Sequence, residues 1–193
     1  FILEEGDVIK KAMRDLYDAD FEQIVIAGKK AYEDAAEFMK LILPKHLSKL
    51  KLHEEKVPLF AKYNVDDKLA ALYDTQVSLR SGGYLVINNT EALVSIDVNS
   101  GRSTGERNVE NTAYKTNVEA AEEIARQLKL RDLSGLIVID FIDMEEIKNR
   151  KNVERIFRDC LANDRAKIQV GKISTFGLLE MSRQRLNPSF MEM

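Results

Sequence analysis

The sequence is poor in cysteine and histidine and has no long apolar run. Its 193 residues include one cysteine and two histidines. One cysteine excludes an intrachain disulfide and a cysteine-based zinc cluster within one chain, and such scarcity is typical of the reducing cytoplasm. No apolar stretch approaches the roughly 18 residues of a membrane span, and no secretory signal is visible. We therefore expect a cytoplasmic protein with no membrane segment in this chain.

Charge gives little direct information about partners. The formal net charge is −3, which does not by itself indicate nucleic-acid binding, although basic residues cluster at 45–56 and 165–172. Hydrophobic residues make up 45% and charged residues 32%, as in ordinary globular proteins. The length suffices for one medium domain or two small ones.

Hydrophobic periodicity predicts an α/β fold in two parts. The first part, 1–74, is expected to hold helices at 7–17, 31–42 and 65–73 and short strands at 24–26 and 49–52. The second part, 75–193, is expected to hold a hairpin of strands 84–87 and 92–98, a helix from about Tyr114, a strand at 136–141, a helix through 153–161, a strand at 166–174 and a last helix at 176–185. Alternating strands and helices favour a mixed, largely parallel sheet with a hairpin edge.

Two apolar strands of the second part end in aspartate, at Asp97 and Asp140. A carboxylate at the end of a buried strand is costly unless water, a hydrogen bond or a cation compensates it. Open α/β sheets bind ligands beyond the carboxyl ends of their strands. If these strands are parallel neighbours, their ends lie about 5 Å apart and both carboxylates can reach one cation. Oxygen ligands suit Mg²⁺, which accepts one or two carboxylates, and Asn99 can add a further polar group.

The alternative is that the aspartates cap loops, a common role at strand ends. Asp143 is three residues beyond Asp140, so the alternation of the strand would place it on the opposite face. It is expected to be the N-cap of the following helix. A Mg²⁺ ion held by carboxylates would activate water and offset charge on a phosphoryl oxygen. The residues alone therefore favour a Mg²⁺-dependent phosphoryl-transfer or phosphohydrolase domain.

Five further residues are candidates for contact with a polyanion. Arg102 and Arg107 lie in a Gly/Ser-containing loop after Asp97, which can contact phosphates or can simply be solvated. Lys167 and Lys172 can line an RNA path, or they can protect a strand edge from aggregation. Phe176 can stack on a base, or it can pack in the core.

Several longer segments strongly resemble the ribonuclease E/G family. They are 49–52 (KLKL), 58–60 (PLF), 81–83 (SGG), 97–102 (DVNSGR), 117–128 (NVEAAEEIARQL), 131–132 (RD), 135–144 (GLIVIDFIDM) and 176–185 (FGLLEMSRQR). The resemblance implies a bacterial Mg²⁺-dependent endoribonuclease that cleaves single-stranded, A/U-rich RNA in mRNA decay and in rRNA and tRNA processing. Its products would carry 5′-phosphate and 3′-hydroxyl ends.

The resemblance also implies a fold and site residues. Residues 1–74 would be the C-terminal part of an RNase H-like subdomain, and 75–193 a DNase I-like catalytic subdomain. The family's metal-binding aspartates fall on Asp97 and Asp140, and its accompanying asparagine falls on Asn99.

Other family segments are expected outside this chain. The S1 and 5′-sensor segments would precede Phe1, and the paired-cysteine zinc link between protomers would follow Met193. Zinc ligands are therefore expected to be absent here, and Cys160 is not one of them. The full-length protein is expected to be a homo-oligomer with a possible role in an RNA-degradation complex, and the isolated chain to be weak or inactive.

Two other functions remain open at this point. The chain can be a non-catalytic RNA-binding or assembly module that retains the fold. It can also be a phosphatase or nucleotidase, which the absence of a P-loop makes less attractive.

Overall fold

The computed structural model describes residues 8–18, 20–101 and 109–186, which fall in two compact units. The first unit is Phe1–Leu69 and the second is Ala70–Met193. The sequence analysis placed a boundary after Asp74, and the RNase H-like and DNase I-like assignments of the two parts stay predictions. Each unit is described below by itself.

The first unit is built on a pair of parallel strands. Its elements are α1 (Val8–Leu16), β1 (Ile24–Ala27), α2 (Lys29–Ile42), the 3-10 helix η1 (Pro44–Lys49), β2 (Leu50–His53), α3 (Leu59–Lys62) and the start of α4 (Val65–Ala71). Strands β1 and β2 pair in parallel, and α2 places Ala35 and Met39, one helical turn apart, against Ile26 and Leu50. Helix α2 ends at Ile42 because Leu43 precedes Pro44, and a residue before proline is sterically disfavoured in the helical conformation.

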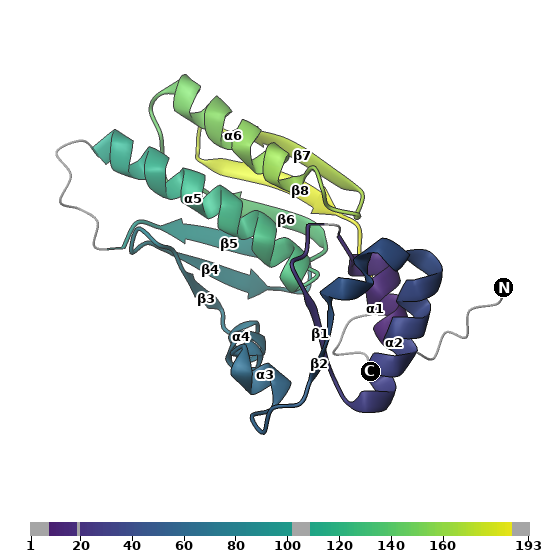
Figure 1. Cartoon of the computed structure of the whole chain (residues 1–193). Helices are drawn as coiled ribbons and strands as arrows, with labels where there is room; N and C mark the ends of the chain where they lie inside the picture. The colour runs from purple at the N-terminus through teal and green to yellow at the C-terminus, as the bar shows by residue number, and fades with distance from the viewer. Residues whose placement is uncertain (1–7, 19, 102–108, 187–193) are drawn as a thin grey trace. The chain divides into compact units, whose positions relative to one another are not determined.

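The second unit contains a six-stranded sheet and two long helices (Figure 1). Its elements are β3 (Gln76–Ser78), β4 (Tyr84–Asn89), β5 (Val94–Asn99), α5 (Val109–Leu130), β6 (Gly135–Asp140), α6 (Ile147–Leu161), β7 (Ile168–Ile173) and β8 (Leu178–Arg183). The strand order is β3-β4-β5-β6-β8-β7. The predicted hairpin at 84–98 is confirmed as β4 and β5.

Helices α5 and α6 lie side by side over one face of this sheet (Figure 1). Alternate strand residues point toward the helices and are buried, such as Ile96 and Val98 of β5 and Ile137 and Ile139 of β6. The intervening residues lie on the opposite face. This alternation determines which side of the sheet carries the aspartates.

The mixed α/β fold is confirmed, but the prediction of a largely parallel sheet is wrong. Strands β5 and β6 form the one parallel pair among the described strands of the six-stranded sheet, and its other four pairings are antiparallel. The difference from the prediction arises at β8. This strand folds back from β7 and inserts between β7 and β6, so that these two strands do not pair with each other.

The prediction of a helix at 176–185 is also wrong, because this segment contains β8. Leu179, Met181 and Arg183 are buried at alternate positions, which is the period of a strand. The leucines, glutamate and methionine of this segment have high helix propensity, but tertiary pairing overrides propensity. A turn with Gly177 at φ +77° returns the chain along β7.

Asp143 is not the N-cap of α6, so that prediction is wrong as well. Glu146 occupies the N-cap position without a side-chain cap hydrogen bond. The carboxylate of Glu110 in α5 instead accepts hydrogen bonds from the backbone N–H groups of Glu145 (2.9 Å) and Glu146 (3.3 Å) and from the side chain of Asn149 (2.7 Å). A residue of the neighbouring helix therefore anchors the two residues that lead into α6 and one side chain of its first turn.

Candidate active site

Asp97 and Asp140 are direct neighbours across the parallel pair β5–β6. The register pairs Val94 with Ile137 and continues to Asp97 with Asp140. The two aspartates alternate along their strands with residues that are buried under α5 and α6, so both side chains are exposed on the opposite face of the sheet. Neighbouring strands are about 4.8 Å apart, so the two carboxylates leave the sheet side by side. The sequence-based prediction of parallel, adjacent strands is confirmed, and the metal-binding role of the pair stays a prediction.

The surroundings of Asp140, including the charge of Asp97, shift its pKa. Burial raises the pKa of Asp140 above its ordinary value, and the negative charges of Asp97 and Asp143 raise it further. Like charges at this spacing favour a compensating cation between or beside them.

Asn99 supports Asp97 from the same strand. Its Nδ2 donates a hydrogen bond of 2.8 Å to Oδ2 of Asp97. Within the residues that the structure describes, neither Asp97 nor Asp140 accepts a hydrogen bond from a backbone N–H, so the loop-capping alternative has no support there.

The site is a pair of carboxylates rather than a larger acidic cluster. Across residues 8–18, 20–101 and 109–186, no group of three or more His, Cys, Asp or Glu side chains is placed to hold a metal ion. This donor set fits Mg²⁺, which commonly binds one or two carboxylates and fills its other positions with water. It does not fit a structural zinc site, which requires four protein ligands, usually with Cys or His among them.

The chain leaving Asp140 is held from two sides. The backbone N–H of Phe141 donates to the carbonyl of Gly177 in the β7–β8 turn (3.2 Å). The next residue, Ile142, exchanges two hydrogen bonds with the side chain of Asn117 in α5. Sequence reasoning assigned no role to Asn117. The available signal was a polar residue at a core position of a largely apolar helix face.

The structure separates the candidate RNA-binding residues. Lys172 and Phe176 lie near the end of the sheet that carries Asp140, because β7 runs parallel to β6 and Asp140 pairs with Leu178. The side chain of Phe176 is 79% exposed, so the alternative of core packing is wrong. Lys167 precedes β7 at the opposite end of the sheet, where it lines a shallow hollow with Gln169, Ser182 and others. Arg102 and Arg107 lie outside the described residues.

The remaining structural findings concern membranes and Cys160. Among the helices that the structure describes, none is both long enough and apolar enough to cross a membrane. Cys160 is partly buried in α6, where burial raises the pKa of its thiol.

Comparison with known proteins places this chain. The model of the ribonuclease E/G family matches residues 1–186. The chain belongs to the ribonuclease E/G family. Its catalytic-region resemblance, drawn first from the sequence motifs, is thereby confirmed.

Individual relatives agree with this assignment. The chain is 50% identical to ribonuclease E of Haemophilus influenzae over 191 residues, which is 99% of the chain and 20% of that protein. It is 47% identical to ribonuclease E of Escherichia coli K12 over 192 residues, covering 99% of the chain and 18% of that protein. It is 38% identical to ribonuclease G of the same strain over 180 residues, covering 93% of the chain and 37% of that protein. The chain thus spans only a fifth to somewhat over a third of these relatives.

Proposed function

We propose that this chain is the catalytic part of a Mg²⁺-dependent endoribonuclease that hydrolyses single-stranded, A/U-rich RNA. The observation that carries the proposal is the register pairing of Asp97 with Asp140 on the exposed face of the sheet. Family membership supports RNA as the substrate, since the relatives are named ribonucleases. We infer that the unit with this pair is the DNase I-like catalytic subdomain and that the first unit is RNase H-like.

Asp97 and Asp140 would hold the ion, and Asn99 would keep the Asp97 carboxylate oriented through its hydrogen bond. A bound Mg²⁺ lowers the pKa of a coordinated water and offsets negative charge on a phosphoryl oxygen. The site has no histidine within its two motifs, and neither His46 nor His53 lies in the unit that contains it. Attack of water on phosphorus with breakage of the P–O3′ bond would leave the proposed 5′-phosphate and 3′-hydroxyl ends, with a proton passing to the departing 3′ oxygen.

Phe176 and Lys172 would guide the RNA beside this pair. An aromatic ring exposed to solvent offers a stacking surface to a base, and a lysine attracts the phosphate backbone. Lys167, at the other end of the sheet, would contact a more distant part of the strand. The proposed roles of Arg102 and Arg107 in phosphate contact rest on the sequence alone.

The remaining proposals concern the whole protein. We infer a bacterial cytoplasmic enzyme of mRNA decay and of rRNA and tRNA processing, homo-oligomeric at full length, with zinc bound by segments other than this chain. Association with an RNA-degradation complex belongs to the same proposal.

The test is cleavage of a 5′-fluorescent single-stranded oligoribonucleotide by the complete protein in which this chain occurs. Cleavage should require Mg²⁺, and Asp97→Asn or Asp140→Asn should lower its rate at least 100-fold, because loss of a metal ligand removes the activated water. The matched control is Asp159→Asn, on the exposed surface of α6, which should keep the wild-type rate. Sealing of the downstream product by a ligase that needs a 5′-phosphate tests the end chemistry.

For the second candidate function, a non-catalytic RNA-binding module, the expected results are the opposite. RNA affinity would persist in a chelator and in Asp97→Asn, and the wild-type protein would leave the oligonucleotide intact. Turnover of a free nucleotide in place of RNA would instead favour the phosphatase alternative.

A further inference from the structure

A buried asparagine contacts the chain just beyond the candidate metal-binding pair. Asn117 is fully buried in α5, on the helix face that also carries Ala113, Ala120, Ala121 and Ile124. An unpaired amide at such a position costs free energy, whereas one with both its donor and its acceptor satisfied can specify a single arrangement.

Asn117 satisfies both polar groups of its amide with one backbone residue. Its Nδ2 donates to the carbonyl oxygen of Ile142 at 2.7 Å, and its Oδ1 accepts from the backbone N–H of Ile142 at 3.0 Å. A strand neighbour exchanges the same two hydrogen bonds with a residue inside an antiparallel ladder. The side chain of Asn117 therefore extends ladder-like restraint two residues past Asp140, where β6 has ended.

The restraint acts together with the β7–β8 turn. Phe141 donates to Gly177, and the adjacent Ile142 is held by Asn117, so consecutive residues after Asp140 are attached to two different elements. Asp143 follows directly. These hydrogen bonds restrain the chain directly after Asp140 and so limit how far the end of β6 can move relative to β5.

We propose that Asn117 is a positioning residue that holds the Asp140 carboxylate in register with Asp97 for metal binding. This inference rests on the proposed function. Asn117 touches neither substrate nor metal in this proposal, and it acts through the backbone of Ile142.

The test uses Asn117→Leu, which keeps the branched shape and the number of non-hydrogen side-chain atoms, is somewhat bulkier, and removes both hydrogen bonds. Asn117→Ser is the milder variant, because its short side chain cannot reach both groups of Ile142 but remains polar. The matched control is Gln127→Leu in the same helix. Gln127 is also buried, and its hydrogen bonds go to Glu123 and Arg131, away from Asp140.

Two measurements are made on the complete protein. Calorimetric titration with Mg²⁺ in the absence of RNA gives the metal affinity, with the signal of Asp97→Asn subtracted to remove other sites. Cleavage kinetics give kcat and KM separately. Loss of a residue that orients a metal ligand typically weakens metal affinity or activity 10- to 100-fold.

We expect Asn117→Leu and Asn117→Ser to weaken Mg²⁺ binding and to lower kcat, each by roughly 10-fold or more, with KM for RNA within about twofold. Gln127→Leu should change neither, although its melting temperature falls. Wild-type metal affinity and kcat in a folded Asn117 variant would overturn the proposal, and so would equal losses in Gln127→Leu. If Asn117→Leu does not fold, Asn117→Ser decides.

The proposed function and the positioning role of Asn117 can be overturned separately. If Asp97→Asn and Asp140→Asn cleave RNA normally, the proposed function is wrong. If those variants are inactive while the Asn117 variants keep wild-type metal affinity and kcat, only the positioning role is wrong.

Discussion

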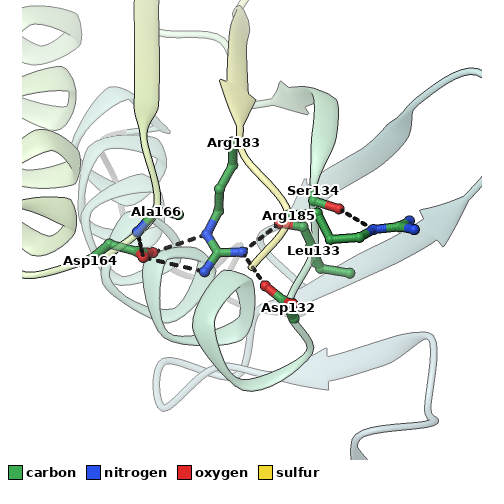
Figure 2. Close-up of polar contacts among 7 residues, drawn as sticks. All are labelled: Asp132, Leu133, Ser134, Asp164, Ala166, Arg183 and Arg185. Carbon is green, nitrogen blue, oxygen red and sulfur yellow. Dashed lines mark hydrogen bonds and ion pairs between the residues drawn. The ribbon is translucent and has the colours of Figure 1, made fainter. Parts of the chain in front are cut away.

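Arg183 and Asp164 form a buried ion pair, with Nε and Oδ2 3.0 Å apart and both side chains 2% exposed (Figure 2). The same guanidinium donates to Asp132 (2.7 Å) and to the carbonyl of Leu133 (3.1 Å). Burial opposes the charge of Arg183, but the hydrogen bonds that it donates to Asp164 and Asp132 outweigh burial and raise the pKa of the guanidinium. Because Asp132 follows α5 and Asp164 follows α6, this one side chain ties the ends of both helices to β8.

Removal of the guanidinium should strongly destabilise the second unit. Arg183→Met removes the guanidinium from the buried Asp164 carboxylate, and breaking a buried pair in this way costs about 3–5 kcal/mol. Urea denaturation followed by circular dichroism measures the change in the free energy of unfolding. The control is Arg155→Met in the exposed pair with Asp159, where the loss should be below about 1 kcal/mol. Equal losses in both variants would contradict the structural role of the buried pair.

The same pair predicts a pH dependence of stability. Burial tends to raise the pKa of Asp164, but hydrogen bonds from Arg183 and from the backbone of Ala166 outweigh it and hold that pKa below its ordinary value. A carboxyl group with a depressed pKa in the folded state stabilises the protein above its unfolded pKa of about 3.9. That stabilisation is lost as the pH falls below about 4, toward the folded pKa.

The measurement is the free energy of unfolding between pH 2 and pH 7, by denaturant titration. In Asp164→Asn the part of the acid-side decline due to this group should disappear. In Arg183→Met it should shrink, because burial then acts on Asp164 without the guanidinium. An unchanged decline in both variants would show that other carboxyl groups cause the acid sensitivity.

The turn beside Asp140 should not tolerate a side chain at Gly177. A Cβ at this residue would lie 2.7 Å from the carbonyl oxygen of Phe141 and 3.0 Å from Oδ1 of Asp143, at φ +77°. Gly177→Ala should therefore cost about 1–3 kcal/mol through backbone strain, with displacement of the neighbouring chain in addition. Gly135→Ala is the matched control, because Gly135 also has positive φ (+87°) but open space around the added Cβ.

The comparison of the two glycine variants separates backbone strain from steric clash. Gly135→Ala should lose only the strain, about 1–2 kcal/mol. Gly177→Ala should lose more free energy of unfolding than Gly135→Ala. A smaller loss at Gly177 would mean that the turn can move away from Phe141 without cost.

Phe176 should contribute to RNA binding without contributing to stability. Its ring is 79% exposed, so Phe176→Ala should leave the melting temperature unchanged. If the ring stacks on a base, the substitution should weaken binding of a single-stranded oligonucleotide by about 1–3 kcal/mol, measured by fluorescence anisotropy in the complete protein. Phe176→Trp should restore affinity and Phe176→Leu should not, because leucine is apolar but has no π face. Wild-type affinity in both Phe176→Ala and Phe176→Leu would exclude stacking.

Sequence pattern was a good guide where local periodicity and burial agree. The alternation of apolar residues in β5 and β6 predicted on which face of its strand each aspartate lies. The register confirms that Asp97 and Asp140 are neighbours. The helices α2, α5 and α6 were foreseen for the same reason, although α5 begins at Val109 rather than near Tyr114. The spacing of apolar residues indicates which face of a helix or strand is buried, and a short stretch of sequence is enough to see it.

Pattern failed where a partner distant in sequence decides the outcome. The segment 178–183 has helix-forming residues, yet it is strand β8 because β6 and β7 flank it on both sides. Asp143 is a good N-cap by residue type, yet Glu110 from another helix supplies the hydrogen bonds to the start of α6. The contacts of β8 with β6 and of Glu110 with Glu145 and Glu146 join residues more than thirty positions apart and leave no local signal.

The sequence by itself determined the family, the alternating strands and the two aspartates that the family resemblance and the strand parity both select. Only the tertiary structure decided that β8 enters the sheet, that Asn117 holds the chain after Asp140, and that Lys172 rather than Lys167 lies at the end of the sheet that carries Asp140. The physical reason is that burial patterns are local properties of a chain. Hydrogen-bond partners and strand order depend instead on which distant segments compete for the same edge, and that is settled only when the whole sheet forms.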